Sequence, residues 1–300
     1  MTRAPKPKPA APRKPRARAA RKPAGPSFAI ALGGGGARGL AHIAALEAFD
    51  ELGVTPAAIA GASMGAVVGA AYAAGIPARA LRSHVLRLTR TPADVMGRLL
   101  RARAGSLGSL LSLGLGNPML LDAEVLLELF WPDGVPAKFD KLRIPFTAVA
   151  TDFHERREVA MTSGALLPAV AGSMAIPGLI KPVERDGRVL IDGGVCNPLP
   201  FDHLFGLADV VVALDVIGEP ATAKAAVPTP FEAMFGAAQI MQRAIANRMV
   251  ALRPPDLLFR PQIEAFRILD FFRAGQILAA GDTMKDEIKR TLAARLDGKA

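Results

Sequence analysis

The stretch Gly61-Ala62-Ser63-Met64-Gly65 has the G-x-S-x-G pattern of a serine nucleophile. Small residues around the serine allow a sharp turn from a strand into a helix, which exposes the serine hydroxyl. The amide of Met64 would then lie where negative charge develops during attack on a carbonyl group. The pattern predicts that Ser63 is an acyl-transfer nucleophile. The alternative is a buried packing turn of small residues.

A glycine-rich stretch, LGGGGARGLAH, follows an apolar run and precedes a helical pattern. Gly34, Gly36 and Gly39 fit the dinucleotide fingerprint G-x-G-x-x-G, but that fingerprint needs an acidic residue about 20 positions further on, and the next strand ends in small residues. Amides of Gly34, Gly35 and Gly36 at a helix N-terminus are also suited to binding an oxyanion, and Arg38 adds a positive charge. We therefore expect an oxyanion loop, with a structural tight turn as the alternative.

A third stretch, Asp192-Gly193-Gly194, ends a segment with the pattern of a hairpin. Asp186-Gly187 is a two-residue turn signal between two short strands, and the second strand runs into Asp192. An aspartate before glycine is most often a turn former, so this stretch alone does not predict catalysis. It becomes a candidate site only together with the other two.

The chain has four histidines that could activate a serine: His42, His84, His154 and His203. His42 follows the glycine loop directly, within its helix, and the other three lie in polar or charged surroundings. We expect each of them to be a surface or helix-cap residue. None is a strong candidate for the base.

Apolar runs stopped by glycine alternate with segments of helical spacing across residues 27–296, and no internal repeat is visible. This pattern predicts one domain of the α/β class with a mostly parallel central sheet covered by helices on both faces, in three layers. Strands are expected at 27–32, 56–61, 144–151 and 209–216, and in the hairpin 183–194. Helices are expected at 39–52, 64–75, 79–90, 120–130, 164–173, 230–252 and 271–295.

The net charge of +10 belongs to the N-terminal tail. Residues 1–26 hold nine Lys/Arg, seven prolines and no acidic residue, and the remainder of the chain is nearly neutral with 28 Lys/Arg against 27 Asp/Glu. Because the tail has few apolar side chains to bury, it is expected to be disordered and not to be a secretory signal. It could serve only for solubility, or it could contact an anionic membrane or nucleic acid. The neutral body argues against a nucleic-acid partner.

The single cysteine, Cys196, excludes an internal disulfide and a cysteine cluster for zinc. The sequence therefore predicts a reducing, cytoplasmic compartment and an enzyme without metal or other cofactor. Residues 54–78 carry no charge, but they are dominated by Ala and Gly, so they are expected to form a buried strand, turn and helix and not a membrane span. The leucine- and glycine-rich segment 105–121 is expected to be either a core connection or a mobile flap over Ser63.

The three stretches, in this order, resemble the signature of the patatin-like phospholipases. That signature consists of a glycine-rich loop, an elbow serine and an aspartate in D-G-[GA]. Residues 150–159 and 173–200 also resemble bacterial members, and the resemblance covers roughly 27–217. Many plant relatives have an acidic residue where this chain has Gly33, whereas glycine is common among bacterial members.

The resemblance implies a Ser63–Asp192 dyad without histidine. It also implies an oxyanion hole formed by the amides of Gly34, Gly35 and Gly36 with help from Arg38. The other positions of the family motifs are Gly39, Gly61, Gly65, Gly193 and Gly194. A carboxylate of normal pKa is a poor base for an alcohol, so Asp192 is expected to be buried.

The function implied is that of a serine acyl hydrolase of lipid or ester substrates, similar to a phospholipase A or lysophospholipase and acting through an acyl-serine in lipid metabolism. Two alternatives remain open. The same acyl-serine could be captured by an alcohol or thiol acceptor, as in an acyltransferase, or the domain could be a catalytically idle regulatory or scaffold protein that binds through its basic tail.

Overall fold

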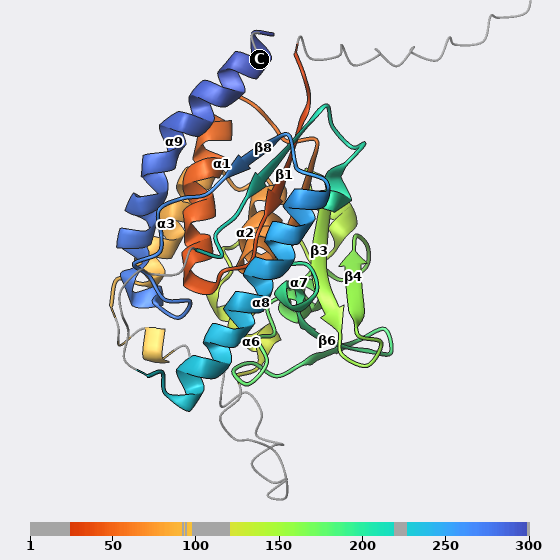
Figure 1. Ribbon diagram of the computed structural model, residues 1–300, viewed down its shortest axis with the longest axis vertical. Coiled ribbons are helices and arrows are strands. Elements are labelled where there is room, and N and C mark those ends of the chain that lie inside the picture. Colours follow the sequence, from red (N-terminus) through yellow and green to blue (C-terminus); the bar gives the residue numbers. More distant parts are fainter. Residues whose placement is uncertain (1–24, 92, 94, 98–120, 219–226, 299–300) are drawn as a thin grey trace, which may run out of the picture.

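The computed structural model describes residues 25–91, 93, 95–97, 121–218 and 227–298, and this part of the chain is built around one eight-stranded sheet (Figure 1). The order across the sheet is β5-β6-β3-β2-β1-β7-β8, and β4 also pairs with β3. The strands are β1 Phe28–Leu32, β2 Ala58–Ala62, β3 Phe146–Asp152, β4 Arg157–Met161, β5 Val183–Arg185, β6 Arg188–Asp192, β7 Val210–Leu214 and β8 Leu257–Phe259.

The centre of the sheet is parallel, because β1 pairs in parallel with β2 and β7, β2 with β3, and β7 with β8. Strands β4, β5 and β6 are antiparallel to their neighbours. The predicted mostly parallel sheet is confirmed. Parallel strands align their carboxyl ends, so the loops after β1 and β2 meet at one edge of the sheet.

Strand β3 brings the ends of β2 and β6 together. Its residue Val149 pairs with Ala62 at the end of β2, and the next residue, Ala150, pairs with Asp192 at the end of β6. Because β4 occupies the opposite edge of β3, β2 and β6 must pair with the same edge. On that edge β6 begins to pair where β2 ends. The register therefore carries Asp192 to the position just beyond β2, where Ser63 follows Ala62.

Helices cover both faces of the sheet. Alternate residues of the strands, such as Ile30 and Ile59, belong to a large core that contains α1, α2 and α9, whereas Ala29 and Ala60 on the other face belong to a smaller core with 3-10 helix η4 and the second half of α8. The α-helices are α1 His42–Glu51, α2 Met64–Ala73, α3 Ala78–Leu88, α6 Ala123–Phe130, α7 Leu166–Ser173, α8 Pro230–Leu252 and α9 Ala274–Leu296. The 3-10 helices are η1 Gly36–Ala41, η2 Phe139–Lys141, η3 Gly193–Val195, η4 Phe201–Leu204 and η5 Phe271–Arg273.

The predicted elements agree with the structure at most positions. The hairpin turn is confirmed by the left-handed backbone of Asp186 (φ 50°) and Gly187 (φ 73°). Two strands, β4 and β8, were not predicted, because the first begins in a charged stretch and the second has only three residues. The first helix also differs from expectation, because a 3-10 turn at Gly36–Ala41 precedes α1.

Residues 54–78 form β2 and α2 as expected. Within the described part of the chain, no helix combines the length and apolar character needed to cross a membrane. The segment 105–121 lies outside the described residues except for Leu121, and the tail lies outside them up to residue 24.

Candidate active site

The predicted elbow is a strained turn between β2 and α2. Ser63 has φ 54° and ψ −125°, a conformation that non-glycine residues seldom adopt, and its side chain is buried with 5% of the residue exposed. The flanking glycines permit the close approach that this turn needs. A Cβ on Gly65 would lie 2.0 Å from the Leu32 carbonyl oxygen, and one on Gly61 would lie 2.5 Å from the Gly65 carbonyl oxygen.

Asp192 faces this elbow from the end of β6. Its Oδ1 accepts a 2.8 Å hydrogen bond from the Gly194 amide, and its own amide donates to the Ala175 carbonyl at 3.0 Å. Burial of the carboxyl group, with 4% of the residue exposed, raises its pKa to about 6, although hydrogen bonds from the Ser63 side chain and the Gly194 amide act to lower it. The serine hydroxyl and a carboxylate of raised basicity thus lie within hydrogen-bonding reach of each other.

The glycine loop passes beside the serine. A Cβ on Gly34 would lie 3.3 Å from the Ser63 Cβ, and Gly36 adopts φ 56°, a left-handed conformation that favours glycine. The Gly34 amide donates to the Pro198 carbonyl at 2.9 Å. Among the described residues, the amides of Gly35 and Gly36 have no hydrogen-bond acceptor, so these two are the free donors of the loop.

Arg38 is buried next to this loop. Its guanidinium donates to the Ile217 carbonyl and to the Gln239 side chain, and its Nε has no partner among the described residues. Burial, followed by the nearby Arg243, lowers the pKa of Arg38. The positive charge is therefore fixed at the carboxyl edge of the sheet, with one donor unpaired.

The remaining motif glycines hold the three stretches against one another. A Cβ on Gly39 would lie 2.5 Å from Met64 Cγ, and one on Gly193 would lie 2.0 Å from the Val149 carbonyl oxygen. Gly194 donates to Asp192 and is covered by Gln242 of α8, whose side-chain nitrogen would lie 2.7 Å from a Cβ on that glycine. The fold thus brings the three sequence stretches into one site.

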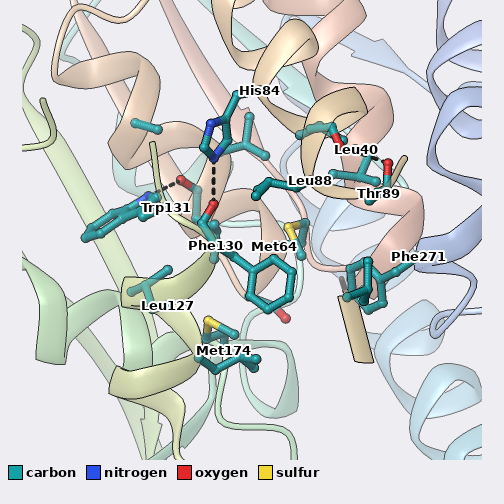
Figure 2. A pocket seen from close by; sticks show the side chains of 18 of the residues that line it. Leu40, Met64, His84, Leu88, Thr89, Leu127, Phe130, Trp131, Met174 and Phe271 are labelled. Carbon is teal, nitrogen blue, oxygen red and sulfur yellow. Dashed lines mark hydrogen bonds between the residues drawn. The ribbon is translucent and has the colours of Figure 1, made fainter. Parts of the chain in front are cut away.

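An apolar cavity of about 340 Å³ opens from this site, and both Gly36 and Ser63 contribute to its lining. Figure 2 shows side chains of its wall, among them Leu40, Phe130 and Trp131. Leucine, isoleucine, valine, methionine and aromatic side chains make up nearly all of the remaining wall, including Leu40, Ile43, Met64, Val67, Val85, Leu88, Leu127, Phe130, Trp131, Met174, Leu179 and Phe271. Hydrogen bonds from Trp131 Nε1 to the Val67 carbonyl and between His84 Nε2 and the Phe130 carbonyl tie the end of α6 to α2 and α3.

His42 is the C-cap of η1, which agrees with one of the two expected positions, but it is not a surface residue. That ring is fully buried, its Nε2 lies 2.8 Å from the Gly33 carbonyl oxygen, and burial lowers its pKa to about 4. The ring therefore supports the glycine loop through its contact with Gly33. His84 is half-buried and lines the apolar cavity, so it is not the surface residue that was expected. His154 is exposed, as expected.

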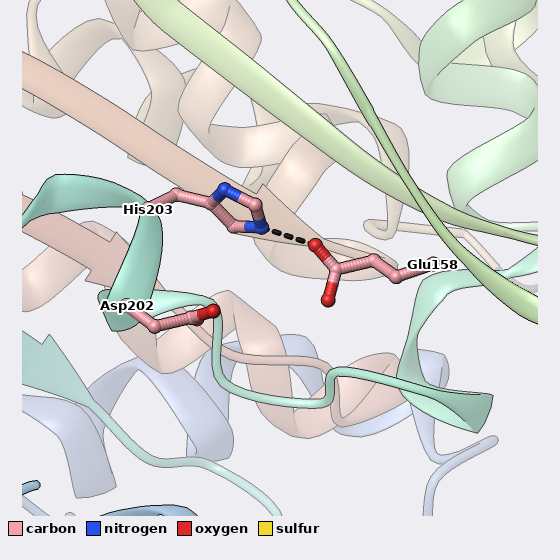
Figure 3. Close-up of side chains that lie close together, drawn as sticks. All are labelled: Glu158, Asp202 and His203. Atoms are coloured by element: carbon pink, nitrogen blue, oxygen red, sulfur yellow. Dashed lines mark hydrogen bonds and ion pairs between the residues drawn. The ribbon is translucent and has the colours of Figure 1, made fainter.

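His203 takes part in a separate polar cluster with Glu158 and Asp202 (Figure 3). It is paired with Glu158, which raises the His203 pKa, and the hydrogen bonds from His203 and Asn197 lower the pKa of Glu158 against the opposing effect of burial. The Asn197 amide also donates to Asp202 at 2.9 Å, and its backbone amide donates to the Gly193 carbonyl. These mutual contacts favour a structural role for the cluster, which supports the loop after Asp192.

Sequence reasoning did not single out Ser173, Gln239 or Gln242. Ser173 is fully buried and accepts a 3.0 Å hydrogen bond from the Ser63 amide. Gln239 and Gln242, on one side of α8, contact Arg38 and Gly194. No motif marks these three residues, although Ser173 begins a stretch that resembles bacterial relatives.

The patatin-like phospholipase model matches residues 30–205, which include all three stretches of the site. The chain belongs to the patatin-like phospholipase family. The predicted family is confirmed.

The relatives agree with this membership. An uncharacterized NTE family protein of Mycobacterium tuberculosis is 39% identical over 197 residues, which are 65% of this chain and 51% of that protein. Lysophospholipase nte1 of Aspergillus fumigatus is 33% identical over 207 residues, 66% of this chain and 12% of that protein. This member thus spans about half the length of the mycobacterial relative. Among solved structures, VipD from Legionella pneumophila superposes with a TM-score of 0.48 and 13% identity, covering 90% of this chain and 67% of VipD.

Proposed function

We propose that this patatin-like protein hydrolyses carboxylic ester bonds of lipids, with Ser63 as nucleophile and Asp192 as its base. The observation that carries the proposal is the strained Ser63 elbow, which lies within reach of a buried carboxylate and opens into an apolar cavity. An acyl chain fits a cavity with an apolar wall, and the ester carbonyl would then lie at the polar end. The relatives named lysophospholipase support a lipid substrate.

The chemistry begins when the Ser63 Oγ attacks the ester carbonyl carbon and its proton passes to Asp192. Burial favours this transfer, because a carboxylate with a pKa of about 6 is a stronger base than a solvated one. The resulting oxyanion is stabilised by the unpaired amides of Gly35 and Gly36. The Gly34 amide, which was also an expected donor, is left out of this set because it is already bonded to the Pro198 carbonyl. The fixed charge of Arg38 adds to this stabilisation.

Collapse of the tetrahedral intermediate breaks the ester bond. Asp192 gives the proton to the leaving alcohol, and the acyl group stays on the Ser63 Oγ. A water molecule, deprotonated by Asp192, then attacks the acyl-serine, and the carboxylic acid leaves as Ser63 recovers its proton. An alcohol acceptor in place of water would give transacylation, so products should be compared with and without such an acceptor.

Residues 1–26, ahead of a folded domain at 27–296, are proposed to add an electrostatic contact with an anionic membrane for an otherwise cytoplasmic enzyme. Nine Lys/Arg without an acidic residue support this, since each gains about 1 kcal/mol near such a surface. Deletion of the tail should weaken binding to anionic vesicles at low salt and leave hydrolysis of soluble esters intact.

The decisive test of the proposal is labelling by a serine-directed fluorophosphonate. The wild type should be labelled at Ser63 and should release fatty acid from a lysophospholipid, and Ser63→Ala should do neither. Labelling that persists in Ser63→Ala would refute the assignment of the nucleophile.

A further inference from the structure

Helix α8 has an unusual outer face. Between residues 233 and 244, every exposed residue is apolar: Ala233, Met234, Ala237, Ile240, Met241 and Ala244. Met234 is 50% exposed, Ile240 72% and Met241 59%. Their spacing of three and four residues places them on one side of the helix. A helix of a soluble domain normally turns its polar side outward, so this face lacks the partner that its composition requires.

The inner side of the same helix segment contacts the proposed site. Gln239 accepts a hydrogen bond from Arg38, Gln242 covers Gly194, and Arg243 forms a 2.6 Å ion pair with Asp215. The second half of the helix is anchored elsewhere, because Ala246 packs on the sheet. The first half of α8 therefore packs on Arg38 and on the loop that follows Asp192, and Figure 1 shows the helix crossing in front of the sheet.

The first turn of α8 lies close to a segment that lines the cavity. Arg267 lies 3.9 Å from Glu232 in the first turn of α8, and it introduces a segment whose Leu269 and Phe272 both line the cavity. Phe272 is half exposed, and Leu269 is also partly open to the outside. The first turn of α8 is thus connected to the rim of the proposed acyl site through the Arg267–Glu232 ion pair.

We propose that the outer face of α8, defined by Met234, Ile240 and Met241 with the three alanines, docks on a lipid surface. The choice of lipid as the partner rests on the proposed function. Two further observations favour lipid over a second copy of the chain. The helix has no acidic residue after Glu232, while Arg248 follows on the exposed side, a pattern that suits an anionic bilayer. The face is also small, because it consists of six residues of one helix, whereas a stable protein interface takes about 20–30 residues a side.

Vesicle binding tests the proposal independently of catalysis. On a Ser63→Ala background, which consumes no lipid, we would compare sedimentation with vesicles of phosphatidylcholine and phosphatidylglycerol in equal parts. The triple variant Met234→Gln, Ile240→Gln, Met241→Gln should bind on the order of a hundredfold more weakly, because three apolar side chains no longer leave water. The control Leu207→Gln changes a leucine that is 56% exposed just before β7, at the amino edge of the sheet, and should bind as the parent does.

The measurement is repeated at high salt, which suppresses the contribution of the basic tail but not apolar insertion. Equal binding by the parent and the triple variant at high salt, or no binding by the parent, would overturn the proposal. Sedimentation equilibrium that shows a dimer lost in the triple variant would also overturn it, in favour of a second copy.

The catalytically intact triple variant separates this inference from the proposed function. It should hydrolyse soluble short-chain esters at the parental rate, because the outer face does not touch the site. If the parent hydrolyses no ester but its vesicle binding depends on the face, the docking surface stands and the hydrolase assignment fails. If hydrolysis is normal and vesicle binding ignores the face, the docking surface fails alone.

Discussion

The backbone amide of Ser63 donates a 3.0 Å hydrogen bond to the hydroxyl of Ser173, which in turn donates to the Val149 carbonyl at 2.5 Å. This pair links the elbow on β2 to α7 and β3 through a fully buried side chain. The strained serine is thereby held by a neighbour 110 residues away in the sequence. Ser173 is a positioning residue in this arrangement, because it acts through Ser63.

Ser173→Ala should leave the Ser63 amide without an acceptor. A buried unsatisfied donor costs about 1–3 kcal/mol, so the melting temperature should fall, and a less well-held nucleophile should lower kcat about tenfold with little change in KM. Ser83→Ala is the control, because that hydroxyl is exposed and bonds only to its own helix. A variant with lower stability but full kcat would assign Ser173 a purely structural role.

Removal of either member of the dyad should abolish ester hydrolysis. Ser63→Ala removes the nucleophile, and Asp192→Asn removes the proton acceptor at nearly constant shape. Because the two act as one unit, the double variant should be no slower than either single variant. Asp133→Asn, at an exposed position, is the control. Near-normal kcat in Asp192→Asn would exclude this carboxylate as the base.

The pH dependence of activity should report Asp192. Only the ionised carboxylate can accept the serine proton, so kcat/KM should fall as the pH is lowered through about 6, the pKa to which burial raises this group. A profile of kcat/KM on a soluble ester would show this midpoint. An inflection near 4 would instead indicate a solvated carboxylate or a different base.

The same pKa predicts that Asp192→Asn stabilises the fold. The carboxyl pKa rises from 3.8 to about 6 on folding, so the wild-type fold becomes less stable relative to the unfolded chain as the pH increases across that interval, and it stays destabilised above it. The penalty corresponds to about 3 kcal/mol at 1.4 kcal/mol per unit. The variant should therefore melt higher at pH 8, with the difference vanishing toward pH 4. If the wild type and Asp192→Asn melted at the same temperature at both pH values, the raised pKa would be contradicted.

Much of the fold follows from local sequence signals, and most of the site does not. Apolar runs locate β1, β2 and β7, and the Asp186-Gly187 turn locates the hairpin that ends at Asp192. The meeting of Asp192 with the elbow depends on the register of β3 against two other strands, which is a pairing between distant segments that no single stretch encodes.

The errors have similar physical causes. His42 has the spacing of an ordinary helix residue, and its burial against the Gly33 carbonyl depends on a contact that helical spacing does not show. The spacing of apolar residues in α8 predicts a helix but not which side faces the sheet, because here the polar side chains Gln239, Gln242 and Arg243 turn inward and the apolar ones outward. Strand β4 begins with two charged residues, so its alternation is weak in the sequence.

Gly65→Ala should disrupt the elbow. The added Cβ would lie 2.0 Å from the Leu32 carbonyl oxygen, and the contact is to backbone, which cannot move away cheaply. We expect a loss of several kcal/mol, about 3 or more, together with loss of activity. Gly236→Ala is a matched control within α8, where nothing lies near the new Cβ, and it should gain about 1 kcal/mol from helix propensity. Normal melting of Gly65→Ala would show that β1 and α2 are less tightly packed than the structure indicates.

The apolar cavity should set the length of the acyl chain. Val67 lines it one helical turn beyond Ser63, so a larger side chain there would occupy space close to the reacting carbonyl group. Each methylene kept out of the cavity forfeits about 0.8 kcal/mol, so Val67→Phe should lower kcat/KM for long-chain p-nitrophenyl esters by about a hundredfold or more while short-chain esters are hydrolysed nearly as before. Val227→Phe is the control, because Val227 is almost fully exposed and outside the cavity. An equal loss for all chain lengths would mean that the variant disturbs the elbow itself. No loss for any chain length would mean that the acyl chain binds outside this cavity.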